Sequence, residues 1–260
     1  MLLALSAPLG CGQCESAPTP TASASAKPLE SVPSLVARPL LEGETIQIDG
    51  ALDEPAWSRA ANAGPFVNVS TGQHDPNLDA GGLAKITWDG RFLYVGFVVA
   101  ERDIQGGFPD GAIDPHLWER DTTEVMIDPD GDGDNKDYYE IQVSPQNLVF
   151  DSRFDDYNLP HGGDHGPFGH EDWSAGLTSA VKVEGTLDDV SDRDRGYSVE
   201  MKIPWRAFSK AKQTPPTPGA EWRMNFYAMK ENDGASWSPI LGQGNFHKAS
   251  RFGRVVFDTQ

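Results

Sequence analysis

The chain has 260 residues, with 39 Asp and Glu residues against 21 Lys and Arg residues, which gives a formal net charge of −18. This charge excludes two functions that need a basic surface, namely binding to nucleic acid and electrostatic adhesion to an anionic membrane. The 27 Gly, the 20 Pro and the aromatic content of 10% are typical of a turn-rich all-β protein.

Residues 1–14 are expected to form a signal-like segment. A short apolar run, MLLALSAPLG, ends in a small residue directly before Cys11. This arrangement resembles the end of a bacterial lipoprotein signal, so Cys11 is the expected site of lipid attachment. The run lacks the basic residues that usually begin a signal peptide, and it is too short to span a bilayer. The expected location is therefore extracellular or periplasmic, either free or held to a membrane by the lipid.

Two further segments follow along the chain. Residues 15–40 are rich in Ser, Ala, Thr and Pro and are expected to form a disordered tether, because such a sequence buries too little apolar surface to offset its ordering entropy. Residues 41–260 are expected to form one folded domain. Cys11 and Cys14 are the only cysteines, so no disulfide can stabilise that domain.

The domain contains many short segments in which apolar and polar residues alternate, separated by turn residues. This alternation has the period of a strand with one buried face. The expected strands are 46–49, 85–88, 93–100, 124–128, 138–143, 148–150, 177–184, 197–203, 222–228 and 255–257. Only 54–61 and 205–209 could each form a turn or two of helix. About ten antiparallel strands without alternating helices predict a β-sandwich or a barrel.

Five motifs occur in the order that is typical of one known family. They are 48–57 (IDGALDEPAW), 88–95 (WDGRFLYV), 117–125 (LWERDTTEV), 194–205 (DRGYSVEMKIPW), and a C-terminal set made of 237–239 (WSP), 246–247 (FH) and 252–253 (FG). Together they resemble carbohydrate-binding module family 9. The resemblance implies an all-β, jelly-roll or immunoglobulin-like sandwich that binds sugars without catalysis, often beside a glycoside hydrolase that degrades polysaccharides.

The resemblance also implies a sugar site in which two aromatic side chains hold the ligand. Trp118 corresponds to the first aromatic residue and Phe246 to the second, where characterised binders carry Trp. Glu124 corresponds to a carboxylate that bonds sugar hydroxyls, and Gln142 stands where those binders carry a basic side chain. Gln243 is a further candidate, because it lies close before Phe246 and could supply an amide contact, as could Asn245. Because Phe246 and Gln142 differ from the residues of the characterised binders, the resemblance does not identify the sugar.

The chemistry of sugars favours the same residue types. Aromatic planes cover the apolar C–H faces of a pyranose, and carboxylates or amides bond its hydroxyl groups. Trp118 lies among polar residues, so we expect it to contact a ligand, whereas Glu124 could equally be a solvated surface acid. Trp237 could belong to the core or to the surface. The tryptophans expected to pack in the core are Trp57, Trp88, Trp205 and Trp222.

An acidic loop follows the predicted strand 124–128. Its carboxylates are Asp128, Asp130, Asp132 and Asp134. The alternate spacing of these carboxylates is similar to the start of a calcium loop, but the expected Glu at the twelfth position is absent and the flanks are strands. The loop is therefore either a structural Ca²⁺ site or a solvated acidic turn.

Other functions remain open at this stage. His161, His165 and His170 could bind zinc, although their spacing is loose for such a site. A haem-binding sandwich would use Met126, Met229 or Lys230 as ligands. A glycosidase would need two carboxylates on either side of a cleft. A surface protein that contacts another protein or a cell-wall polymer would need no affinity for free sugars.

Overall fold

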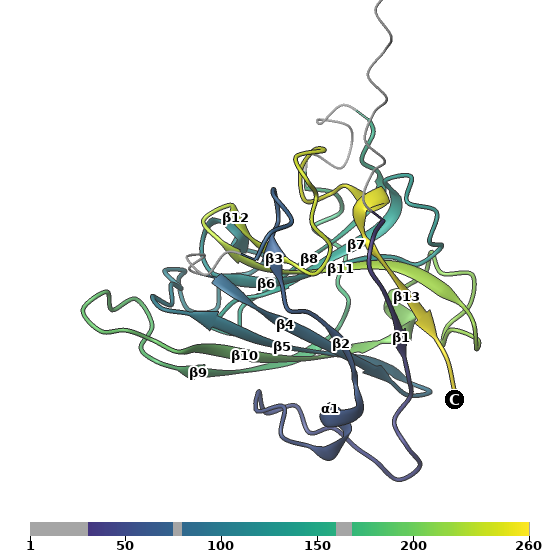
Figure 1. The fold of residues 1–260 in the computed structure, drawn as a ribbon, viewed down its shortest axis with the longest axis horizontal. Helices are drawn as coiled ribbons and strands as arrows, with labels where there is room; N and C mark the ends of the chain where they lie inside the picture. The colour runs from purple at the N-terminus through teal and green to yellow at the C-terminus, as the bar shows by residue number, and fades with distance from the viewer. Residues whose placement is uncertain (1–30, 75–79, 160–167, 260) are drawn as a thin grey trace, which may run out of the picture. The chain divides into compact units, whose positions relative to one another are not determined.

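The computed structural model describes residues 31–74, 80–159 and 168–259. Within it, Val32–Gln260 forms one compact unit in which two β-sheets stack face to face as a sandwich (Figure 1). Cys11, the signal-like segment 1–14, His161 and His165 lie outside the described residues, so the roles predicted for them stay predictions.

The larger sheet has eight strands, and its main path runs β1-β13-β11-β6-β7-β8. Its strands are β1 (Ser34–Ala37), β3 (Val67–Asn68), β6 (Thr122–Asp128), β7 (Lys136–Val143), β8 (Val149–Asp156), β11 (Glu221–Lys230), β12 (Asp233–Ser236) and β13 (Gly253–Phe257). β12 pairs with both β11 and β3 beside this path. All the pairs are antiparallel except β1 with β13, which is parallel.

The smaller sheet has five antiparallel strands in the order β2-β4-β5-β10-β9. They are β2 (Ala61–Ala63), β4 (Ala80–Trp88), β5 (Phe92–Glu101), β9 (Thr178–Glu184) and β10 (Gly196–Pro204). The short helical elements are α1 (Pro55–Arg59), η1 (Leu117–Glu119), η2 (Trp205–Ala207) and η3 (Ala249–Arg251). Among the described residues, no helix has the length and apolar composition that crossing a membrane requires.

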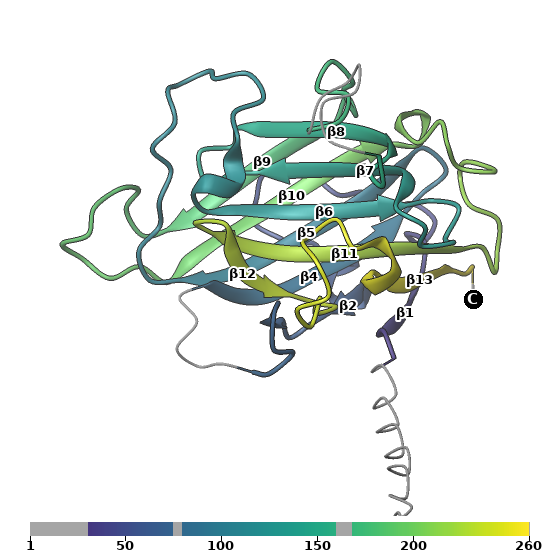
Figure 2. The ribbon, with the colours of Figure 1, turned by 90° about the horizontal axis from the view of Figure 1, so that it is seen from above.

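The larger sheet is buried on both of its faces. Val125 and Ile127 of β6 point between the sheets into the main core, while Met126, between them, belongs to a second apolar cluster on the outer face. This outer cluster is covered by the segment that follows β12 and includes Ile240 and Phe252. Figure 2 shows this C-terminal segment, in yellow, crossing over β11 and β6. As a result, all seven residues of β6 are buried.

Most of the predicted strands are confirmed, and the two short helical segments coincide with α1 and η2. The prediction of a strand at 46–49 is wrong, because Ile46 instead packs beside Trp57 in a small cluster with α1. β1 lies at 34–37, inside the range expected to be a tether that ends at residue 40, so the fold begins earlier than residue 41. Those residues are ordered because β13 supplies a partner for their backbone.

The expected core tryptophans are confirmed. The four buried indoles are those of Trp57, Trp88, Trp205 and Trp222. Trp237, which the sequence assigned to neither place, is half-buried and packs against Phe226 with ring centroids 5.7 Å apart. Its ring also covers Gly253, where an added Cβ would lie 2.3 Å from the indole. This close approach explains why the C-terminal motif pairs a Trp with a later Gly.

Glu200 of β10 fixes the 48–57 motif against the outer face of the smaller sheet. Its Oε2 accepts hydrogen bonds from the backbone N–H groups of Asp49, at 2.8 Å, and Gly50, at 2.7 Å, and its Oε1 accepts one from Trp57 Nε1 at 2.7 Å. Gly50 has a φ of +87°, and a Cβ there would lie 2.7 Å from the carbonyl carbon of Val181. Glu200 therefore satisfies three donors with one buried carboxylate.

We expect Glu200→Gln to lower the free energy of unfolding by about 2 kcal/mol. The amide NH₂ group would replace one of the two carboxylate oxygens and cannot accept a hydrogen bond, so at least one buried N–H donor would lose its acceptor. Urea unfolding followed by tryptophan fluorescence measures the change. The control is Glu42→Gln, which alters an exposed carboxylate. Equal stability of the two variants would contradict the anchoring role of Glu200.

Candidate functional site

A pocket of about 260 Å³ lies on the outer face of the larger sheet. Its floor is formed by side chains from β6, β7, β8 and β11, and its walls come from η1 and from the loop between β12 and η3. The lining residues are Trp118, Glu124, Glu140, Gln142, Phe154, Tyr157, Phe168, Met229, Asn232, Asn245, Phe246 and His247. The pocket therefore combines aromatic rings with two carboxyl groups and several amides.

Four of the five predicted binding residues meet in this pocket. Trp118, Glu124, Gln142 and Phe246 all line it, although they are spread over more than a hundred positions of the chain. Glu124 on β6 and Gln142 on β7 are direct cross-strand partners. Gln243 does not line the pocket. It lies in the turn that leads to Phe246, where its backbone N–H donates to the carbonyl of Ile240 at 3.2 Å.

Gln142 joins two buried acids at the pocket floor. Its Nε2 donates to Glu124 Oε2 at 2.7 Å and to Glu140 Oε1 at 2.6 Å. The exposed fraction is 2% for Glu124 and 4% for Glu140. The remaining oxygens, Glu124 Oε1 and Gln142 Oε1, are buried without a hydrogen-bond partner in the described part of the chain. Such atoms are costly unless a ligand or water reaches them.

Burial also changes the acidity of this pair. Burial raises the pKa of Glu140 to about 7, and the hydrogen bond from Gln142 opposes that rise. The pKa of Glu124 is raised well above its ordinary value, first by burial and then by the charge of Glu140. Because two neighbouring carboxylates resist ionising together, the pair retains a proton near neutral pH.

Trp118 is held in place by its surroundings. The ring of His116 stacks on the indole with centroids 4.4 Å apart and an interplanar angle of 18°, and Phe150 meets it edge-on at 5.0 Å. The backbone N–H of Asn232, in the turn after β11, donates to the Trp118 carbonyl at 2.8 Å. The indole is half-buried and lines the pocket, and its contact with a ligand stays a prediction.

The loop that carries Phe246 is anchored to the sheet by aromatic contacts. Tyr227 donates its hydroxyl hydrogen to the Phe246 carbonyl at 3.0 Å. His247 stacks on Tyr157 with centroids 4.3 Å apart and planes 7° from parallel, and its Nδ1 lies 2.8 Å from the Tyr138 hydroxyl. These contacts hold the part of the pocket wall that Phe246 forms.

Sequence reasoning missed several lining residues. The interpretation of the sequence did not use Glu140, although it lies two positions before Gln142 in a predicted strand and so shares its face. That alternation alone could have placed Glu140 in the site. Tyr157 and His247 offered no such signal, because their position depends on how a loop after β8 meets a loop after β12.

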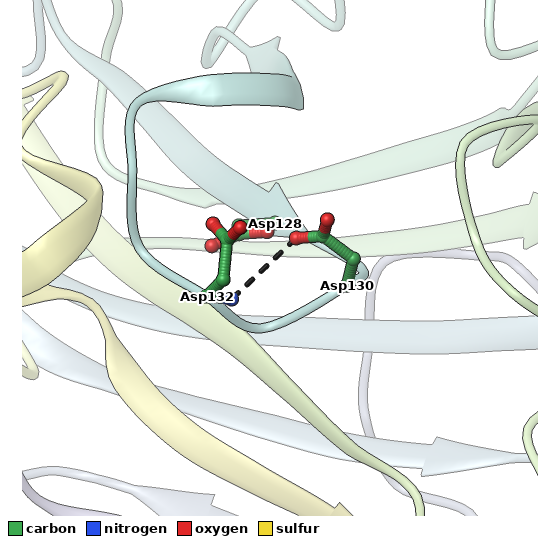
Figure 3. A group of neighbouring side chains, drawn as sticks. All are labelled: Asp128, Asp130 and Asp132. Carbon is green, nitrogen blue, oxygen red and sulfur yellow. Dashed lines mark hydrogen bonds between the residues drawn. The ribbon is translucent and has the colours of Figure 1, made fainter.

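The acidic loop between β6 and β7 brings three of its four carboxylates together. Oxygen atoms of Asp128, Asp130 and Asp132 all lie within 4.8 Å of one another (Figure 3). Burial, and after it a hydrogen bond with Asp130, raises the pKa of Asp128 to about 7. Asp134 is not part of this group. Its carboxylate lies 3.7 Å from Lys136 Nζ. The three convergent oxygens are the type of ligand that Ca²⁺ prefers.

The residues named for the haem and zinc alternatives do not gather at one place. Met229 lines the pocket, but Lys230 Nζ is bound by Glu101 Oε1 at 2.9 Å and lies 3.6 Å from Asp121, away from it. Met126 is fully buried in the outer cluster. His170 Nε2 contacts the carboxylate of Asp155 on β8. None of these described groups forms a ligand set with its neighbours.

A two-layer sandwich with an aromatic and acidic pocket on one outer face defines a class of ligand-binding β-modules. The chain belongs to the family of carbohydrate family 9 binding domain-like proteins, whose model matches residues 48–260. This match confirms the family resemblance that the five motifs predicted. None of the curated proteins matches the sequence.

Three solved structures that are similar to the chain share this fold. A carbohydrate binding module of family 9 from Caldicellulosiruptor kristjanssonii, in complex with cellotriose, has a TM-score of 0.55 and 16% identity over 87% of this chain and 94% of that one. The same kind of module in complex with glucose has a TM-score of 0.56 and 17% identity over 87% and 96%. A protein from Bacteroides uniformis has a TM-score of 0.62 and 18% identity over 88% and 100%. At these identities the likeness shows the fold.

The pKa of Glu140 predicts how stability depends on pH. The folded pKa, about 7, exceeds the ordinary value of 4.5, so the folded state holds a proton that the unfolded chain has lost. The stabilisation that Glu140 contributes is therefore fully present below about pH 4.5 and is lost as the pH rises through about 7. Between pH 5 and pH 7.5 the free energy of unfolding of the wild-type protein should therefore fall by on the order of 2 kcal/mol because of Glu140. We expect this fall to be absent in Glu140→Gln.

Chemical unfolding across that pH range measures the effect, with Glu42→Gln as the variant of an exposed acid. An unchanged slope in Glu140→Gln would show that Glu140 ionises normally in the folded protein.

Proposed function

We propose that the domain is a non-catalytic carbohydrate-binding module and that the pocket on the larger sheet is its sugar site. The observation that carries this proposal is the convergence of Trp118, Glu124, Gln142 and Phe246 around two buried oxygen atoms without partners. The rings of Trp118 and Phe246 would cover the apolar faces of a pyranose. The hydroxyl groups of the sugar would donate to Glu124 Oε1 and Gln142 Oε1.

Comparison with relatives supports the same function. The family match covers most of the chain, and the similar modules from Caldicellulosiruptor kristjanssonii were solved with cellotriose and glucose. A module of this kind would hold its protein near a glycan, beside enzymes that break down polysaccharides.

The arrangement of the two acids supports binding over hydrolysis. Glycosidases need carboxyl groups about 5 Å or more apart, on opposite sides of the scissile bond. Here one amide nitrogen bonds both Glu124 and Glu140, and the two carboxyl groups also bond each other. They therefore form a single pair at the floor, with no space for a sugar between them.

Replacing Trp118 tests the proposal. We expect Trp118→Ala to weaken binding of the best-bound oligosaccharide by about 10-fold or more, ~1.4 kcal/mol, because the ligand loses one of its two stacking surfaces. Isothermal titration calorimetry against glucose, cellotriose and a glycan panel measures the affinity. Phe246→Ala should have a similar effect.

The matched control is Phe92→Ala, which removes a half-buried ring from the smaller sheet, away from the pocket. Thermal unfolding of each variant shows whether the fold is retained. Full affinity in a folded Trp118→Ala variant would rule out this pocket as the sugar site, and hydrolysis of any glycan by the wild-type domain would contradict a purely binding role.

We also propose that Asp128, Asp130 and Asp132 bind a structural Ca²⁺ ion. Their convergence and the raised pKa of Asp128 support a site that favours a divalent cation. The loop joins β6 to β7, which carry Glu124 and Gln142, so an ion there would stiffen the strands of the pocket floor.

Calcium at about 100 times its dissociation constant should stabilise the domain by ~2.7 kcal/mol. For a domain of this size we expect a rise of roughly 5 °C or more in the midpoint of thermal unfolding. Asp130→Asn should abolish the rise, whereas Asp134→Asn should keep it, because Asp134 lies outside the convergent group. Equal midpoints with calcium and with a chelator would exclude the site.

A further inference from the structure

The pocket floor presents acceptors to a ligand. Both hydrogens of the Gln142 amide are directed at carboxylates, Glu124 Oε2 at 2.7 Å and Glu140 Oε1 at 2.6 Å, so only its oxygen remains to meet a ligand. Among the described residues that line the pocket, that oxygen and Glu124 Oε1 are the two buried side-chain atoms without a hydrogen-bond partner. The proton that the pair retains lies in the hydrogen bond between Glu124 and Glu140, so Glu124 Oε1 is left as an acceptor. The ligand group that reaches the floor must therefore bring hydrogens.

The floor also holds two adjacent carboxyl groups that no Lys or Arg side chain neutralises. Among the described residues that line the pocket there is no Lys or Arg. The imidazole of His247, which carries a positive charge only when protonated, has its Nε2 3.8 Å from Glu140 Oε2. A buried carboxylate without a cation is costly, and this cost keeps the pair partly protonated. A positive group on the ligand would take the place of that proton.

The walls suit a cation as well as a sugar ring. Trp118, Tyr157 and Phe246 present aromatic rings around the acids, and such rings attract a cation by about 0.5–2 kcal/mol. A quaternary ammonium would also favour these rings, but it has no hydrogen for Glu124 Oε1 and Gln142 Oε1. A primary ammonium has three donors in addition to its charge.

We propose that the preferred ligand is a sugar with a free amino group, such as a 2-amino-2-deoxyhexose or an oligosaccharide of deacetylated amino sugars. The ammonium group would donate to Glu124 and Gln142 at the floor, and the sugar ring would lie between Trp118 and Phe246. This inference rests on the proposed sugar site and adds the chemical class of its ligand.

Calorimetry at pH 7 with glucose, glucosamine and N-acetylglucosamine tests the inference, because the three sugars share a ring and differ at one substituent. We expect glucosamine to bind at least about 10-fold more tightly than the other two, which corresponds to ~1.4 kcal/mol. In Glu124→Gln and in Glu140→Gln the ratio of the glucosamine and glucose affinities should fall towards one, whatever happens to each affinity alone. Trp118→Ala should weaken both sugars.

The outcomes separate this inference from the proposed function. Glucose binding that equals or exceeds glucosamine binding would overturn the amino-sugar preference and leave the sugar site intact. A preference for glucosamine that persisted in both acid variants would also overturn the inference, because the acids would then not be its cause. If no sugar bound, while choline or methylammonium did, the sugar site and the amino-sugar inference would both fail.

Discussion

The larger sheet is covered on both faces, and the rest of the site depends on this constraint. One face packs on the smaller sheet to form the main core, and the other packs under the segment that follows β12. An ordinary sandwich strand alternates between a buried and a solvated side. In β6 the alternation instead divides side chains between the main core and the outer apolar cluster. Glu124 points to the outer cluster, so it is shielded from water among apolar neighbours. The chemistry of the pocket follows from that placement.

Burying two carboxyl groups at the pocket floor costs free energy, and the surrounding contacts offset part of that cost. Gln142 holds both carboxyl groups with one amide, and the neighbouring strands prevent either acid from turning out to solvent. Part of the cost remains, because two buried oxygen atoms of the floor have hydrogen-bonding capacity that only a ligand or water can satisfy. A rigid floor with unmet hydrogen bonds discriminates strongly among ligands, because a molecule that lacks the right donors gains little from entering.

Sequence alone predicted much of the fold and the centre of the site. Alternating patterns located most strands, because residues that face the main core alternate with residues of the other face, which include polar ones such as Glu124 and Gln142 even where that face is covered. The pattern failed at 46–49, where an alternating tetrapeptide packs as an irregular segment beside α1, and at 34–37, where order comes from a distant strand. Trp118 and Phe246 were found through ordered motifs. Tyr157 and His247 could not be found, because their contact is set by three-dimensional packing between loops.

The parallel pairing of β1 with β13 has a mechanical consequence. Residues 34–37 lie in register beside 254–257, and the two strands run in the same direction. The chain enters the domain at one end of this pair and leaves it at the other. A force that pulls the two ends of the domain apart therefore loads the hydrogen bonds between these strands in shear, all at once, and does not peel them open one after another. This geometry protects the edge of the larger sheet against a force applied through the two ends of the domain.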